Sequence, residues 1–232
     1  MNRSLLVRLA PLALAGCGAA QVNGTNATSA GKELAPAAAP DVEIRDASGA
    51  VVAGKAVGMD GVAEGLAWPG LRAALARKPG DHTALTVAVA RGVPLGLVLR
   101  AVWTLRDADL RLQTADASGA VHVLELRPKP DVPPAADATE CHLAVFVAPS
   151  GDVRVATPGG PHVISGAKAA DGLAAALAAE SPGCPIRYVG FGAENADAAW
   201  SQVFDVARAV DRDKSAGDAR YVLAEPVHQA GR

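Results

Sequence analysis

Apolar and polar residues recur along the chain with the periods of strands and helices. Residues 41–45 alternate polar and apolar side chains, as a half-buried strand does. Residues 70–77 and 94–107 carry apolar side chains at helical spacing, and we expect a helix in each. Further strands are expected at residues 51–53, 85–90, 110–114 and 121–126.

The same order of elements returns in the second half of the chain. Strands are expected at residues 142–147, 152–155, 186–191 and 220–224, and helices at 172–178 and 196–211. The turn Ser48-Gly49 and the helix start Gly70 both reappear 102 positions later, at Ser150-Gly151 and Gly172. The predicted class is α+β: two tandem two-layer sandwiches, each β-β-α-β-α-β with helices on one face of a small mixed sheet.

A proline-rich segment separates the two repeats. Residues 127–139 contain Pro128, Pro130, Pro133 and Pro134, a composition typical of a semi-rigid linker. The predicted organisation is therefore a signal peptide at 1–16, a tether at 17–40, unit 1 at 41–126, the linker at 127–139, unit 2 at 140–226 and a tail at 227–232.

The N-terminus has the features of an export signal. Arg3 and Arg8 supply positive charge, and the apolar stretch at 9–15 is far shorter than the roughly 20 residues that cross a bilayer. The motif Leu14-Ala15-Gly16-Cys17 resembles the lipobox of bacterial lipoproteins. That resemblance implies that Cys17 is lipidated and becomes the first residue. The alternative is an ordinary secretory signal with an incidental cysteine.

The residues after Cys17 indicate how the folded part is held at the membrane. Gly18 stands where an aspartate would favour inner-membrane retention, so the outer membrane is favoured over the inner. Residues 18–40 are rich in Gly, Ala, Asn, Thr, Ser and Pro and lack strand or helix periodicity. Such a segment cannot offset its ordering entropy by burial, which makes it a flexible tether.

The amino-acid composition restricts the core and the class of protein. Of the 232 residues, 50% are hydrophobic but only 3% are aromatic, so the core has to be built mainly from aliphatic side chains. The formal net charge is −2 and the isoelectric point about 6.2, which excludes an electrostatic nucleic-acid binder. A mean hydropathy of +0.18 with clear periodicity excludes disorder throughout.

Two cysteines remain once Cys17 is assigned to the anchor. Cys141 and Cys184 are candidates for a disulfide, because exported proteins meet an oxidising compartment. Two buried thiols and a catalytic thiol are the alternatives.

Known catalytic motifs are missing from the sequence. Its five histidines are scattered, and we find no H-E-x-x-H, G-x-S-x-G, P-loop or G-x-G-x-x-G. The glycine-rich residues 157–162 are interpreted as a turn, with a ligand loop as the alternative. Trp103 and Trp200 are expected to pack in the core or between the units. A solvated charged face is expected for Asp205, Asp211, Arg212, Asp213 and Lys214. We predict no catalytic residue, no cofactor and no metal.

One family resemblance emerges from the first unit. The segments 42–44, 71–75, 85–90 and 98–109, with the turn Ser48-Gly49, resemble the periplasmic domain of the ExbD/TolR biopolymer-transport family in order and spacing. Residues 140–226 repeat the pattern more weakly. Family members usually have a transmembrane helix bearing an aspartate that couples to a proton-driven motor. Here a lipoprotein signal replaces that helix, and Arg91 stands where an acidic residue is common.

These observations together favour an envelope protein without a reaction of its own. The resemblance implies a retained and duplicated interaction module that is anchored to the membrane by lipid. We expect it to bind envelope proteins, as an accessory to biopolymer transport or envelope integrity, and not nucleic acid. Self-association is left open. The alternatives are a small-ligand receptor with a pocket between the units and an enzyme with an unrecognised site.

Overall fold

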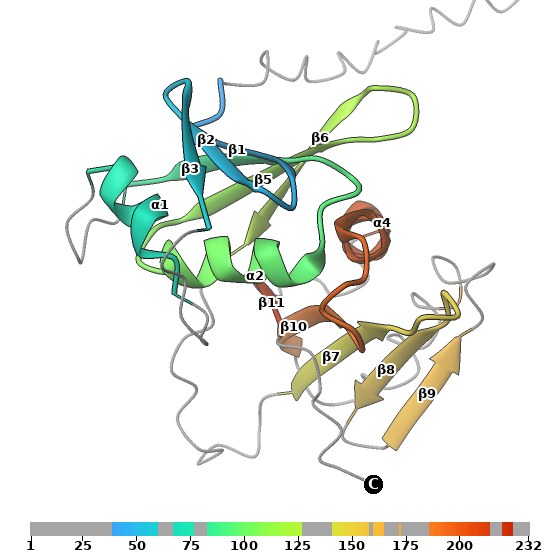
Figure 1. The fold of residues 1–232 in the computed structure, drawn as a ribbon. Coiled ribbons are helices and arrows are strands. Elements are labelled where there is room, and N and C mark those ends of the chain that lie inside the picture. The colour runs from blue at the N-terminus through green and yellow to red at the C-terminus, as the bar shows by residue number, and fades with distance from the viewer. Residues whose placement is uncertain are drawn as a thin grey trace, which may run out of the picture. The chain divides into compact units, whose positions relative to one another are not determined.

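The computed structural model describes residues 39–59, 67–76, 83–126, 141–157, 160–164, 172, 186–213 and 220–224 (Figure 1). Their fold is mixed α+β, with one six-stranded and one five-stranded sheet, both mixed. The α+β class predicted from the sequence is thereby confirmed. Residues Pro36–Arg232 group into one compact body that contains both sheets.

The six-stranded sheet belongs to unit 1, and its strands run in the order β3-β2-β1-β4-β5-β6. Strand β1 is parallel to β4, and β4 is parallel to β5, whereas the remaining pairs are antiparallel. The strands are β1 Val42–Asp46, β2 Gly49–Val52, β3 Lys55–Gly58, β4 Leu85–Val89, β5 Leu110–Ala115 and β6 Val121–Leu126. The helices are α1 Pro69–Ala74 and α2 Leu95–Thr104.

The five-stranded sheet belongs to unit 2 and repeats this topology. Its order is β11-β10-β7-β8-β9, with β7 parallel to β10 and β10 parallel to β11. The strands are β7 Cys141–Val147, β8 Val153–Thr157, β9 Gly160–Ile164, β10 Ile186–Ala193 and β11 Arg220–Leu223, and the helix is α4 Trp200–Asp213. Strands β7 to β11 therefore take the places that β1 to β5 hold in unit 1.

Strand registers support the same correspondence at single residues. Val42 pairs with Val52 in β2 and with Val87 in β4. In the same way, Val145 pairs with Val155 in β8 and with Phe191 in β10. The internal repeat seen in the sequence is thus a repeat of strand pairing as well.

Two strands lie where none is expected from the sequence. Strands β3 and β9 each form an antiparallel edge next to the strand before them. Ala53 and Gly54 both have positive φ, 48° and 78°, and this tight turn returns β3 onto β2. Residues 157–162, interpreted as a turn between elements, contain the end of β8 and the start of β9, and Thr157 pairs with Gly160.

Helix α4 starts later than its periodicity predicts. The expected helix covers 196–211, but α4 begins at Trp200, because residues 196–199 form a turn that bonds to unit 1. In unit 1, α1 and α2 end at Ala74 and Thr104, before the predicted ends at 77 and 107. Only residue Gly172 of the expected helix at 172–178 lies among the described residues, where it is helical.

The core is continuous across both units and mainly aliphatic. Its largest side chains are aromatic, and each is at most 1% exposed: Trp68, Trp200, Phe191 and Phe204. Within β1, Val42 and Ile44 are buried while their neighbours face outward, as the alternating sequence requires.

Several sequence-based assignments fall outside the described residues. They include the signal at 1–16, the lipidation site Cys17, the linker at 127–139, the tail at 227–232 and Cys184. Cys141 is the first residue of β7, and its disulfide with Cys184 stays a prediction. Among the described residues, no helix has the length and apolar character needed to cross a membrane.

Candidate functional site

The two units meet where the second helix of each begins. We call residues 91–94, before α2, entry loop 1, and residues 196–199, before α4, entry loop 2. Each loop consists of a two-residue turn, a bend and a single bridge residue, and leads directly into its helix. Aligning the loops residue by residue places Arg91 opposite Ala196 in the alignment, and Leu95 opposite Trp200. Pro94 and Ala199 are corresponding residues as well, and they pair with each other as an isolated antiparallel bridge.

Backbone hydrogen bonds on either side of this bridge are reciprocal. The Leu95 N–H donates to the Ala198 carbonyl at 2.8 Å, and the Trp200 N–H donates to the Val93 carbonyl at 2.7 Å. The first N–H groups of a helix have no partner inside it, and Pro94 supplies no side-chain cap for α2. Each helix is therefore capped by the entry loop of the other unit.

A second reciprocal pair follows one residue further into each helix. The Gly96 N–H donates to the Ala196 carbonyl at 2.8 Å, and the Ser201 N–H donates to the Arg91 carbonyl at 3.0 Å. A Cβ atom on Gly96 would stand only 3.3 Å from both the Cβ and the carbonyl oxygen of Ala196. Glycine at this position therefore allows the close approach of the two backbones.

One buried side-chain hydrogen bond also crosses the junction. The indole Nε1–H of Trp200 donates to Thr114 Oγ1 at 2.8 Å, and both residues are buried. Phe204, one turn further along α4, packs against the Trp200 ring at 5.6 Å between centroids. Because an indole N–H needs a partner once buried, this bond fixes where α4 sits against β5.

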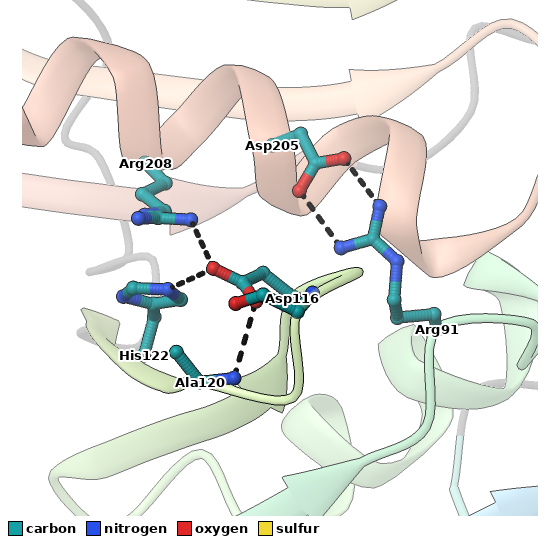
Figure 2. Close-up of polar contacts among 7 residues, drawn as sticks. Arg91, Asp116, Ala120, His122, Asp205 and Arg208 are labelled. Atoms are coloured by element: carbon teal, nitrogen blue, oxygen red, sulfur yellow. Dashed lines mark hydrogen bonds and ion pairs between the residues drawn. The ribbon is translucent and has the colours of Figure 1, made fainter.

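Charged side chains form a cluster at the edge of the same junction (Figure 2). Arg91 of entry loop 1 donates from Nη1 and Nη2 to the two carboxylate oxygens of Asp205 on α4, at 3.1 and 2.6 Å. This two-pronged geometry matches a guanidinium to a carboxylate. The hydrogen bond to Asp205 raises the pKa of Arg91, and the nearby charge of Asp116 adds to that effect.

Asp116, in the turn between β5 and β6, is the centre of the other half of the cluster. Its Oδ1 accepts from the backbone N–H groups of Ser118 and Ala120 at 2.8 and 3.1 Å. Its Oδ2 lies 2.7 Å from Nε2 of His122 and 3.5 Å from Nη1 of Arg208 on α4. Hydrogen bonds from the Ser118 hydroxyl and from His122 hold the pKa of Asp116 well below its ordinary value.

The chemistry open to this cluster is limited by its internal pairing. Arg91 and Arg208 of the cluster each face a carboxylate, and Asp116 receives donors on both oxygens. Within the part of the chain that the structure describes, every buried side-chain nitrogen and oxygen has a hydrogen-bond partner. Over the same residues, no group of three or more His, Cys, Asp or Glu side chains is arranged to hold a metal ion. The arrangement is suited to joining the two units.

Packing in the core or between the units was expected for two tryptophans, and the structure confirms it for Trp200 but not for Trp103. Trp200 packs between the units with no exposed surface, as expected. Trp103 is 41% exposed, and the guanidinium of Arg106 lies 4.6 Å from its ring centroid. Trp103 occupies the α2 position that corresponds to Arg208 of α4, whereas Trp200 stands at the start of its helix, inside the junction.

Other residues singled out in the sequence lie apart or are used differently. Asp205 and Asp211 are both exposed, as expected of a solvated face, but each also has a partner: Asp205 pairs with Arg91, and Asp211 accepts a hydrogen bond from Tyr221. Burial, and to a smaller extent the charge and the hydrogen bond of Asp211, raise the pKa of Tyr221 to about 12. Of the histidines, His122 belongs to the cluster and His162 lies on β9.

Sequence reasoning missed Asp116 and Arg208, although a signal for Asp116 exists. Residues 46–51 and 116–121 have the same sequence, Asp-Ala-Ser-Gly-Ala-Val. In both turns the aspartate accepts from the backbone N–H of the serine two residues later, at 2.8 Å. Only Asp116 also meets His122 and Arg208, and nothing within the six residues distinguishes the two.

Comparison with known proteins adds no relative. No protein-family model, no curated protein and no solved structure matches this chain.

Proposed function

We propose that this chain is a lipid-anchored, non-enzymatic protein of the bacterial cell envelope that acts as a protein-interaction module. The lipobox-like motif ending at Cys17 supports the anchor, and the outer membrane is favoured because Gly18 follows it. Residues 18–40 form the tether between the anchor and the folded body. Its partners are other envelope proteins, and its role is accessory to biopolymer transport or envelope integrity.

The finer architecture proposed for each unit is a two-layer sandwich, with helices on one face of the sheet. Burial alternates along β1, where Val42 and Ile44 are buried, and along β6, where Leu124 and Leu126 are buried. Such alternation supports one covered and one solvated face. In unit 1 the order is β1-β2-β3-α1-β4-α2-β5-β6, which contains the predicted β-β-α-β-α-β with β3 and β6 added at the sheet edges. This order and the alternation support the resemblance of unit 1 to the ExbD/TolR periplasmic domain.

The junction between the units is the observation that carries the non-enzymatic part of the proposal. In an enzyme, a small number of polar groups usually converge on the substrate inside a mostly apolar cleft. Here the convergent groups Arg91, Asp205, Asp116 and Arg208 are bonded to one another across two units. Their pairing supports an assembly role over a catalytic one.

Exposed apolar side chains supply a candidate contact surface for a partner. Val121 and Val123 lie two residues apart on β6, on the same side of the strand, and are 50% and 43% exposed. Glu125 continues this outward row. A row of apolar residues bordered by charge is a usual composition for a protein-binding surface.

The anchor is tested by labelling cells with radioactive palmitate and fractionating the envelope. Wild type should be labelled and recovered in the membrane fraction, whereas Cys17→Ser should be unlabelled and released. Cys184→Ser is the matched control and should behave as wild type. An unlabelled, cytoplasmic wild-type protein would contradict the proposal.

The interaction role is tested by crosslinking in intact envelopes, followed by purification of the chain. We expect defined envelope proteins to be recovered with wild type and lost with Val121→Lys/Val123→Lys. Arg45→Glu, an exposed change on β1, is the control and should retain them. Recovery of the same proteins with the double lysine variant would reject β6 as the contact surface.

A further inference from the structure

We propose that units 1 and 2 form a covalently fused two-fold dimer, and that Arg91, Arg100 and Asp205 select pairing between the two different units over self-pairing between chains. The entry-loop surface of unit 1 thus has a defined partner, which is unit 2 of the same chain. This inference concerns the folded body alone and does not depend on the lipid anchor.

The symmetry follows from which residues meet. In a two-fold interface, if residue i contacts residue j, then j contacts i, and residues on the axis meet their own equivalents. Pro94 opposite its equivalent Ala199 fulfils the second condition. Four backbone hydrogen bonds, two from each helix start, fulfil the first. Two unrelated surfaces would have no reason to satisfy both conditions.

The side chains of the junction do not follow this symmetry, and their charges favour pairing between unit 1 and unit 2 over pairing of two identical units. Arg91 pairs with Asp205, but the positions related to these two by the symmetry hold Ala196 and Arg100. Two copies of unit 1 paired through the same surface would bring Arg91 of each chain to Arg100 of the other. Two copies of unit 2 would bring Ala196 to Asp205, with no ion pair. Among these three pairings, the mixed one is the pairing that places a carboxylate opposite Arg91.

The buried bond at the junction favours the same choice. Leu95 is the unit 1 residue that corresponds to Trp200 of unit 2. In a self-pair of unit 1, the leucine would replace the indole next to the buried hydroxyl of Thr114. That hydroxyl would lose its donor, and the smaller side chain would leave space in the core. Self-pairing of unit 1 is therefore disfavoured by charge and by packing.

Cysteine crosslinking of residues on the symmetry axis tests the proposal directly. The protein used is the full chain, and peptide mass spectrometry identifies which positions are joined. Pro94→Cys/Ala199→Cys should form a disulfide between positions 94 and 199 within one chain. Pro94→Cys alone should stay monomeric, because its equivalent in a second chain is not brought to it. A disulfide between positions 94 and 199 found mainly between chains would overturn pairing in cis.

Charge reversal then tests the selection. Arg91→Asp would remove the repulsion from Arg100 in a unit 1 self-pair, so Arg91→Asp/Pro94→Cys should give at least about fivefold more dimer crosslinked through position 94 than Pro94→Cys. Adding Arg100→Asp should return the dimer to the Pro94→Cys level. The counterpart Asp205→Arg/Ala199→Cys should give no excess of dimer crosslinked through position 199. Circular dichroism checks folding, and Arg91→Glu replaces any Arg91→Asp variant that does not fold.

The charge-reversal variants at positions 91, 100 and 205 can each contradict the proposed selection. Equal dimer yields with and without Arg91→Asp would overturn the selection by charge. So would a dimer that persists after Arg100→Asp, or one that forms equally from the Asp205→Arg counterpart.

Discussion

Units 1 and 2 have the same strand order but differ in what their second helices carry into the junction. Helix α2 begins with Leu95, and α4 begins with Trp200, which is buried against Thr114 of unit 1. Helix α2 places the exposed Trp103 where α4 has Arg208, the partner of Asp116. The backbone of the junction is thus symmetric, while its side chains give each unit a different role.

The largest effect is expected from removing the side chain that distinguishes α4. Trp200→Ala should lower the free energy of unfolding by about 3–5 kcal/mol, because a fully buried indole leaves a cavity. Trp103→Ala should cost clearly less, since 41% of Trp103 is already exposed to solvent in the folded state. Urea denaturation of residues 36–232 measures both, and equal costs would contradict the assignment of Trp200 to the junction.

Crowding the shared backbone contact should give the next effect. Gly96→Leu forces a side chain against Ala196 and should destabilise the protein by about 1–3 kcal/mol. Gly92→Leu in entry loop 1 is the matched control, because no atom lies within 4 Å of a Cβ at that position. The control should stay close to wild type in thermal unfolding. A loss of stability as large as that of Gly96→Leu would show that the loop itself, not its contact, is sensitive.

The Trp200–Thr114 bond can be separated from the packing of the ring. Thr114→Val leaves the buried indole N–H without an acceptor and should cost about 1–3 kcal/mol. In a Trp200→Phe background the same change should cost clearly less, because the donor is already gone. A double-mutant cycle by chemical denaturation checks this, and an unchanged cost would mean that Thr114 acts through another contact.

The smallest effect should separate the two identical turns. Asp116→Asn should lower the melting temperature, because the carboxylate faces Arg208 and His122, and Arg91 is nearby. Asp46→Asn should lower it less, since its carboxylate is held mainly by Ser48. Melting temperatures of the two variants measured side by side test this difference. A larger fall for Asp46→Asn would contradict the role of Asp116 at the junction.

The stability that Asp116 contributes should change with pH in one direction. The pKa of Asp116 is lower in the folded state than its ordinary value of 3.8, so ionisation stabilises the fold. That contribution is fully present above the ordinary value and is lost as the pH falls toward the lower folded pKa. The difference between wild type and Asp116→Asn should therefore be largest near neutrality and shrink in strong acid. A difference that grows in acid would be inconsistent with a lowered pKa.

Much of the fold could be predicted because it depends on short-range patterns. The strands β4, β5 and β6 and the helix α2 follow from apolar periodicity within about ten residues. Strands β3 and β9 were missed because neither alternates clearly, and each is stabilised by pairing with the strand before it. Their existence depends on a sheet edge that the local sequence does not encode.

The candidate site was less predictable than the fold. Arg91 and Asp205 are separated by 114 positions, and their pairing depends on how two units meet. The two tryptophans show the same dependence on the junction, because Trp103 lies in the more apolar helix segment and yet is 41% exposed, whereas Trp200 is fully buried between the units. Helical periodicity says which side chains share a face, but not whether another unit covers that face.

By itself, the sequence determined the α+β class and the order and repetition of the elements other than β3 and β9, because hydrophobic periodicity and turn residues act over a few neighbouring positions. The tertiary structure alone decided that the entry loops cap each other's helices and that Asp116, unlike Asp46, meets a second unit. The reason is that a hydrogen bond or ion pair between distant residues forms only after the chain has brought them together. Identical sequences such as 46–51 and 116–121 then acquire different partners from their surroundings.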